Sequence, residues 1–194
     1  MNLTELERDI KKELRASMNG ILSARMRQAG MPFKLIFGTE LPRLQDIARE
    51  FPIDAELAQH LWQQPIRETK LLAIMLMPVE AFTPAVTEAW AETMVTAEEA
   101  QIMAMLLLPE VPEAEAIAKG WLESDQPLPA TCGALCLRHL LTRGCIQDAA
   151  VVEAIQKSIN QRPSTDNLHL KKALQALSFA IIEKKEGQNS AEIK

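Results

Sequence analysis

The hydrophobic positions of this chain follow a helical period over most of its length, most plainly at residues 65–78. That stretch has a charged first turn, then seven consecutive apolar residues, then a proline. Prolines bracket it, with Pro65 at a helix-start position and Pro78 where a helix must stop. A helix that is charged for one turn and then apolar all round must be buried on most sides. The pattern therefore predicts the inner helix of a packed layer.

Shorter amphipathic segments precede this stretch. Apolar residues recur along one face of residues 3–19, which Asn2 or Thr4 can cap, and Gly20 then interrupts the pattern. Further short helices are predicted at residues 21–29, 42–50 and 55–63. Residues 31–38, which include Phe33, Ile36 and Phe37 and end at Gly38, are predicted to be a connecting loop. The N-terminal third is thus expected to consist of short helices joined by loops, without strands.

Aromatic and small residues then recur at a regular spacing. The three tryptophans, Trp62, Trp90 and Trp121, are 28 and 31 residues apart, and each lies near the end of an amphipathic segment. A mostly apolar helix follows each tryptophan, with a small residue at Ala73, Ala104 and Ala134, which are 31 and 30 residues apart. Two helices per period of about 30 residues indicate a repeat array of short helix pairs.

The repeat units are expected at residues 57–77, 86–108 and 117–141, and a weaker unit pairs residues 151–159 with 168–182. The predicted fold is all-α, an α-solenoid or superhelix of HEAT-like antiparallel helix pairs in one domain over residues 1–183. An irregular helical bundle with a coincidental tryptophan spacing is the alternative. Residues 184–194 are charged and poor in large apolar groups, so they are predicted to form a flexible tail.

The composition favours helix over sheet, and the charge is distributed unevenly along the chain. The 194 residues include no tyrosine, and the net charge is −5. Residues 1–50 carry a balance of +2, residues 51–130 of −10 and residues 131–194 of +3. An acidic middle segment has to be kept away from any bound phosphate. No apolar run reaches membrane-spanning length and the N-terminus is charged, so we expect a cytoplasmic protein without membrane association.

The cysteines offer the one hint of a metal site. Cys132, Cys136 and His139 would share one face of a helix, while Cys145 lies apart. No fourth ligand with paired spacing follows, so the alternative is that the two cysteines are small apolar core residues. We expect reduced thiols, no metal and no cofactor.

Several segments resemble a known family. Residues 26–30, 33–38 and 41–49 resemble its N-terminal signature, and Leu61-Trp62 followed by Ile66-Arg67-Glu68 resembles its next one. The chain is similar here to the HEAT-like-repeat DNA alkylation repair family, whose best-known members are bacterial alkylpurine DNA glycosylases. The likeness covers about residues 15 to 145. It implies a right-handed, C-shaped stack of helix pairs whose concave face holds duplex DNA.

The resemblance also implies where catalytic residues should lie. Active members place a Trp and an Asp four residues apart on the helix after the one that bears Trp90, and an Arg on the corresponding helix of the next unit. These positions fall here on Ala97 and Gln101, and at or near Thr131 or Cys132. The catalytic residues are therefore not matched. Glu98 and Glu99 are weak substitutes, and their alternative explanation is that carboxylates are favoured at a helix start.

Basic residues toward the two ends of the chain are the candidates for DNA contact. They are Lys34, Arg43, Arg67, Lys70, Arg138, Arg143, Lys171 and Lys172. Neutralised phosphates supply most non-specific affinity, although such residues also occur simply as a solvated face. Two hypotheses follow. The protein is a DNA alkylation repair-like protein that binds duplex or branched DNA on its concave face, or it is a non-catalytic scaffold that binds a protein partner or structured DNA.

Overall fold

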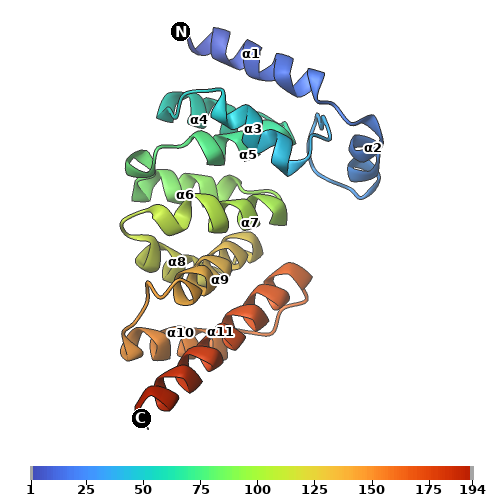
Figure 1. Cartoon of the computed structure of the whole chain (residues 1–194). Coiled ribbons are helices and arrows are strands. Elements are labelled where there is room, and N and C mark those ends of the chain that lie inside the picture. Colours follow the sequence, from blue (N-terminus) through green and yellow to red (C-terminus); the bar gives the residue numbers. More distant parts are fainter. Residues whose placement is uncertain (1, 193–194) are drawn as a thin grey trace. The chain divides into compact units, whose positions relative to one another are not determined.

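The computed structural model describes residues 2–192, with side chains through residue 187, and these residues are all helical or loop (Figure 1). They form eleven α-helices and two short 3-10 turns, and their only strand-like pairing is an isolated bridge between Leu35 and Ile66. The all-α prediction is confirmed. The chain divides into two compact units, Met1–Trp90 and Ala91–Lys194. The single domain expected over residues 1–183 stays a prediction.

Unit 1 is built on short helices, three of which have side-chain N-caps. Its elements are α1 (Leu3–Ala16), α2 (Gly20–Gln28), α3 (Leu41–Arg49), α4 (Ala55–Trp62), α5 (Arg67–Leu76), the 3-10 turn Val79–Ala81 and most of α6 (Pro84–Thr93). Asn2, Asn19 and Asp54 cap α1, α2 and α4 through side-chain oxygens that accept backbone N–H groups of the first turn. The helices α3 and α4 both pack on α5, and α1 packs on α4. The core of unit 1 is therefore centred on α5.

The burial predicted for α5 is confirmed, but its start is not where the proline pattern placed it. Nine of its ten residues are buried, including the whole charged first turn. The helix begins at Arg67 after the N-cap Ile66, so Pro65 precedes the helix and does not occupy its first turn. The carbonyl of Pro65 instead accepts the N–H groups of Lys34 and Leu35 at 3.0 and 3.3 Å. Pro65 thus joins the loop before α3 to the loop before α5.

Unit 2 is organised around one long helix. Its elements are α7 (Ala97–Leu106), the 3-10 turn Leu108–Glu110, α8 (Ala114–Leu122), α9 (Pro127–Thr142), α10 (Ala149–Gln161) and α11 (Leu168–Glu192). The helix α9 packs against α7, α8 and α11. At Gly133 the backbones of α8 and α9 touch, since a Cβ there would lie 2.5 Å from the carbonyl oxygen of Ala118 and 2.6 Å from the nitrogen of Leu122. The absence of a side chain at Gly133 permits this close packing.

The recurring tryptophans and alanines occupy comparable positions. Trp62, Trp90 and Trp121 all lie in the last turn of their helices and are buried. Ala73, Ala104 and Ala134 lie inside α5, α7 and α9, and all three are fully buried. The period predicted from the sequence therefore corresponds to a period of buried positions, and each repeat contains two helices.

The expected C-terminal tail starts inside a helix. Residues 184–192 belong to α11, which runs from Leu168 to Glu192. Residues 193–194 lie outside the described part of the chain. The flexibility of this tail stays a prediction.

Candidate nucleic-acid interface

The two glutamates considered as substitute catalytic groups lie in the first turn of α7. Glu99 is fully buried, and its carboxylate accepts the backbone N–H of Val95 at 2.9 Å and the hydroxyl of Thr96 at 3.1 Å. Thr96 in turn accepts the N–H of Glu99 at 3.3 Å. This reciprocal pattern is that of a helix-capping carboxylate. Glu98 is only partly buried, so it is the one of the two with a surface that a substrate could reach.

The three positions that correspond to the family's catalytic residues lie on packed helices of unit 2. Ala97 and Gln101 are one turn apart on α7, and Thr131 is in the first turns of α9, which packs on α7. Gln101 is exposed, whereas Thr131 is 1% exposed and its hydroxyl donates to the carbonyl of Pro127 at 2.6 Å. A methyl group, a neutral amide and an internally bonded hydroxyl place no charge and no aromatic face at these positions.

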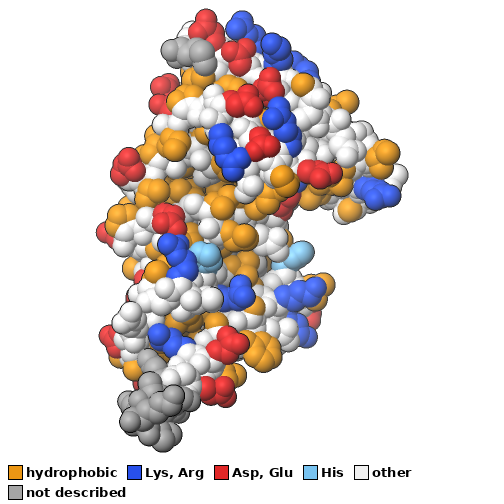
Figure 2. Space-filling model, in the orientation of Figure 1, with side chains coloured by type: hydrophobic (Ala, Val, Ile, Leu, Met, Phe, Trp, Pro, Cys, Tyr) orange, Lys and Arg blue, Asp and Glu red, His pale blue; other side chains and the backbone are white. Residues whose placement is uncertain are grey.

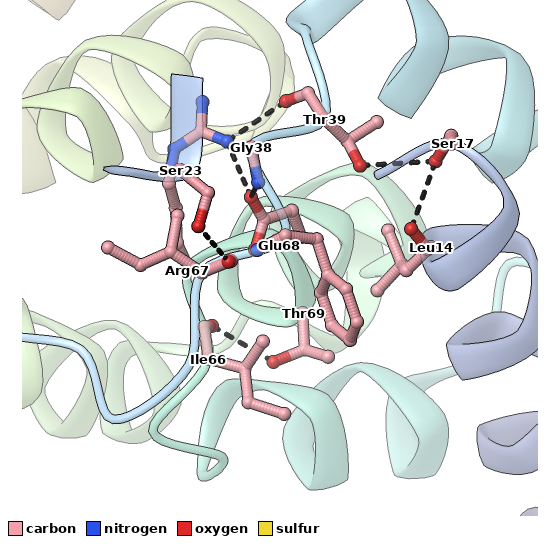
Figure 3. Close-up of polar contacts among 11 residues, drawn as sticks. Leu14, Ser17, Ser23, Gly38, Thr39, Ile66, Arg67, Glu68 and Thr69 are labelled. Carbon is pink, nitrogen blue, oxygen red and sulfur yellow. Dashed lines mark hydrogen bonds and ion pairs between the residues drawn. The ribbon is translucent and has the colours of Figure 1, made fainter. Parts of the chain in front are cut away.

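Arg67 is inconsistent with the DNA-contacting role expected from the sequence, because it lies in the core of unit 1 (Figure 3). Its guanidinium Nη1 donates to the carboxylate of Glu68 at 2.8 Å and to the carbonyl of Thr39 at 3.0 Å. Glu68 is fully buried and also accepts the backbone N–H groups of Phe37 and Gly38 at 3.0 and 2.9 Å. We call this network the Glu68 latch. It fastens the loop before α3 to the first turn of α5.

Lys70 is likewise part of the core and not of a surface. It is 7% exposed, and its Nζ lies 4.0 Å from the ring centroid of Trp62. Trp62 stacks on Trp90 with centroids 4.2 Å apart and rings parallel to within 1°, and the edge of Phe82 meets Trp90 at 5.2 Å. Both tryptophans are 3% exposed. The cluster is a buried cation–π and stacking arrangement, so it offers no open ring face on which a nucleic-acid base could stack.

Two further basic candidates reach the surface but are already paired: Arg43, which is half-buried, and Arg143, which is exposed. Arg43 contacts Glu13 at 2.9 Å and Glu50 at 3.7 Å. Arg143 forms an ion pair with Glu110, and this partner raises the pKa of the guanidinium. A phosphate would have to compete with these carboxylates. Arg43 and Arg143 are therefore weaker candidates than their exposure suggests.

The remaining basic candidates are exposed and form no ion pair within the described part of the chain: Lys34, Arg138, Lys171 and Lys172. Figure 2 shows Lys, Arg and His side chains over α9 and α11 on the visible face. The same description holds for three residues that the sequence reasoning passed over, Arg15, Arg25 and Arg27. A signal for them was present, because residues 14–39 contain no acidic residue.

The cysteines behave as core residues. Cys132 and Cys136 are both fully buried in α9, and burial raises the pKa of Cys136 to about 12 and that of Cys132 well above its ordinary value. Both thiols are therefore protonated at neutral pH. Among the described residues, no three His, Cys, Asp or Glu side chains are grouped closely enough to hold a metal ion.

Comparison with known proteins identifies the family. A sequence model of the family described as DNA alkylation repair enzyme matches residues 10–173. A solved structure described as "A new family of proteins related to the HEAT-like repeat DNA glycosylases with affinity for branched DNA structures" has a TM-score of 0.77 at 16% identity, covering 95% of this chain and 79% of that one. No curated protein matches the chain. Within the described residues, no helix is both long and apolar enough to cross a membrane.

The structural likeness and the helix pairs agree on a HEAT-like repeat fold. The family match covers well over half of the sequence, including every helix from α2 to α10. The chain therefore belongs to the DNA alkylation repair enzyme family.

Proposed function

We propose that this protein binds DNA, branched DNA included, and does not excise alkylated bases. Membership of the DNA alkylation repair family and the similarity to a protein described as having affinity for branched DNA support the binding half of the proposal. The residues at the three family-equivalent positions, Ala97, Gln101 and Thr131, support the other half. That set of three neutral side chains is the observation on which the proposal rests.

Base excision needs charge where these residues have none. Breaking the glycosidic bond develops positive charge on the sugar and the departing base, which a nearby carboxylate or aromatic face stabilises. Removing one such preorganised group typically lowers the rate by about a hundredfold to a thousandfold. Ala97 and Gln101 cannot replace an indole and a carboxylate. Thr131 is internally hydrogen-bonded and cannot act as a guanidinium.

The most direct test of the missing chemistry is an excision assay. Duplex DNA that contains 7-methylguanine is incubated with the protein, and free base is measured by chromatography against a protein-free blank. We expect no release above the blank. Release that disappears in Glu98→Gln would overturn the proposal and assign the reaction to the carboxylate that is still accessible in α7.

DNA binding is expected to use the exposed cations of unit 2 that carry no carboxylate partner. Lys171 and Lys172 lie in the first turn of α11, and Arg138 lies on α9, on which α11 packs. In the double variant Lys171→Gln/Lys172→Gln, the slope of log affinity against log salt should fall by about 1.8, since each lost phosphate contact contributes about 0.9. The double variant Arg49→Gln/Lys119→Gln is the control.

The control removes the same charge from surface residues that already have partners. Arg49 pairs with Asp46 at 2.6 Å and Lys119 with Glu115 at 3.9 Å. Fluorescence anisotropy with a linear duplex and a four-way junction at ~50 mM salt, where phosphate contacts are strongest, measures both variants. If the unmodified protein binds neither DNA, the proposed function is wrong. Equal salt slopes for the two double variants would show that Lys171 and Lys172 do not contact DNA phosphates.

The acidic segment supports a second candidate, a scaffold for a basic protein partner. Of the thirteen acidic residues in 51–130, Glu68 and Glu99 are buried; of the three basic ones, Arg67 and Lys70 are buried. Eleven acidic residues of this stretch thus lie outside the core beside one basic residue, Lys119, although Arg143 pairs with one of them, Glu110. A stretch of that charge repels phosphates and attracts cationic proteins. Failure to bind either DNA, together with salt-sensitive binding of a polylysine probe, would favour this candidate.

A further inference from the structure

The loop and helix between α1 and α3 carry a charge pattern found nowhere else in unit 1. Residues 14–39 contain four basic residues and no acidic one. The basic residues are Arg15, Arg25, Arg27 and Lys34, and all four are exposed. Elsewhere in unit 1, each basic residue has an acidic residue within a few positions. The segment is therefore a locally cationic surface on a protein whose net charge is negative.

Ion pairing separates these residues from the other arginines of unit 1. Outside the segment, each arginine contacts a carboxylate: Arg8 contacts Asp9, Arg43 contacts Glu13, Arg49 contacts Asp46 and Arg67 contacts Glu68. Inside the segment, Arg15, Arg25 and Arg27 form no ion pair with any described residue. Their charge is not neutralised within the protein, so an external anion can bind without displacing a partner.

The same segment contains exposed apolar side chains. Among the described residues of unit 1, four large hydrophobic residues are exposed, and three of them belong to this segment: Met18 at 59%, Ile21 at 73% and Leu35 at 39% exposure. Ser23 is the buried residue of α2, so Ile21 and Arg25, one turn apart, lie on the face that points away from the core. Figure 2 shows Lys or Arg and hydrophobic side chains together over α2, at the right of the view.

Hydrogen bonds attach α2 to the loop that precedes α3. Ser23 donates its hydroxyl proton to the carbonyl of Ile36 at 2.6 Å, and the backbone N–H of Asn19 donates to the carbonyl of Phe37 at 3.0 Å. Asn19 also caps α2, and the Glu68 latch fixes the next two backbone N–H groups of the loop. The N-cap and the first half of α2 are thus tied to the loop before α3. A surface fixed in this way loses little conformational entropy when it binds.

Resting on the proposed DNA binding, we propose that Met18, Ile21, Arg25, Arg27, Lys34 and Leu35, here called the α2 patch, contact DNA at branch points. The cations bind the phosphates that converge at a branch. Ile21 packs against the base-pair face that is left open there. In a continuous duplex an apolar side chain must first unstack a base step, at a cost of a few kcal/mol, and at a branch that cost is absent. The α2 patch therefore favours branched over linear DNA.

Ordinary features explain only part of this arrangement. Arg25 and Arg27 lie in the last turn of α2, where the helix dipole favours cations. That effect accounts neither for Lys34, which lies in the loop, nor for the exposure of Ile21. A cationic and apolar surface also suits an anionic membrane, but membrane-surface helices present a broad apolar face, and α2 presents Ile21 alone on its outward face.

Two variants test the two parts of the patch. Arg25→Gln/Arg27→Gln should weaken binding to a linear duplex and to a four-way junction alike, and should lower the salt slope by about 1.8. Ile21→Ser should weaken junction binding by about tenfold and leave duplex binding unchanged, because each wedge contact corresponds to a few kcal/mol of stacking at most. All altered side chains are exposed, so thermal unfolding midpoints should match the unmodified protein.

Matched controls lie in the same unit. Arg49→Gln removes an exposed arginine that is paired with Asp46, and Ile53→Ser removes an isoleucine that is 69% exposed outside the patch. If the α2 variants bind both DNAs as these controls do, while Lys171→Gln/Lys172→Gln is weakened, the α2 patch is refuted and the proposed function stands. If the unmodified protein binds no DNA, the proposed function is wrong, and the α2 patch, which rests on it, is wrong as well. Loss of binding to phosphatidylserine vesicles with unchanged DNA binding would also overturn the α2 patch.

Discussion

The first turns of α5 and α7 contain a buried glutamate at the same repeat position and use it differently. Glu68 precedes Ala73 by five residues, Glu99 precedes Ala104 by five, and both carboxylates are fully buried. Glu68 binds backbone N–H groups about 30 residues away and pairs with Arg67. The contacts of Glu99 with Val95 and Thr96 stay within its own helix start. Glu68 thus links segments that are distant in the sequence, and Glu99 contributes to the cap of its own helix.

This difference shows that repeat position fixes burial and not the role of the side chain. Both glutamates follow a short loop and precede an apolar helix. At Glu68 the loop before α3 is close enough to present two backbone donors to the carboxylate. Three residues before Glu99, Thr96 is the N-cap of α7 and accepts the backbone N–H of Glu99. A charged first turn on an inner helix is therefore no sign by itself of a residue that lines a binding groove.

The largest expected effect comes from Glu68→Gln. The substitution removes the counter-charge of Arg67 inside the core, and breaking one partner of a buried pair costs about 3–5 kcal/mol. Urea unfolding should show a free energy of unfolding lowered by that amount, and the exposed control Glu40→Gln should stay within about 0.5 kcal/mol. A loss below about 1 kcal/mol for Glu68→Gln would mean that the latch does not hold the fold.

Gly38→Ala should be the next most destabilising change, because Gly38 lies in the loop whose backbone N–H groups donate to Glu68. Gly38 has a φ of +77°, and a Cβ there would lie 2.4 Å from the carbonyl oxygen of Asn19 and 2.7 Å from the nitrogen of Ser23. We expect a loss of about 2–4 kcal/mol from the backbone penalty plus the clash. Gly30→Ala separates the two, since Gly30 has a φ of +80° with open space around it and should lose only about 1 kcal/mol. Equal losses in the two variants would show that α2 does not pack closely on this loop.

The sequence was sufficient for the helices and their repeat period, because those depend on local spacing. The apolar run in residues 71–77 predicted a buried α5, and the spacing of Ala73, Ala104 and Ala134 predicted buried positions. The burial of Arg67 could not be predicted in this way. Its partners include the carbonyl of Thr39, which is 28 residues distant, and no local pattern relates the two.

The candidate site was predicted less well for the same reason. In the sequence, Arg43, Arg67 and Lys34 are equally good basic candidates. In the structure, carboxylates neutralise Arg43 and Arg67. Only the folded chain shows which cations have partners. The run without acidic residues in 14–39 was visible in the sequence, but its meaning depends on the exposure of Ile21 and Arg25, which the tertiary fold determines.

The smallest expected effect lies on the α7 side of the comparison, in Thr96→Ala. The change removes the hydroxyl that accepts the N–H of Glu99 and donates to its carboxylate, and loss of such a cap costs about 1 kcal/mol. Thr142→Ala is the matched control, since that hydroxyl only returns to the carbonyl of Arg138 inside its own helix and should change stability by no more than about 0.5 kcal/mol. Unfolding in urea measures both. Because the hydrogen bonds of Thr96 lie within one helix start, their loss should be well below that of Glu68→Gln. A Thr96→Ala loss of equal size would mean that the cap of α7 contributes as much to stability as the Glu68 latch.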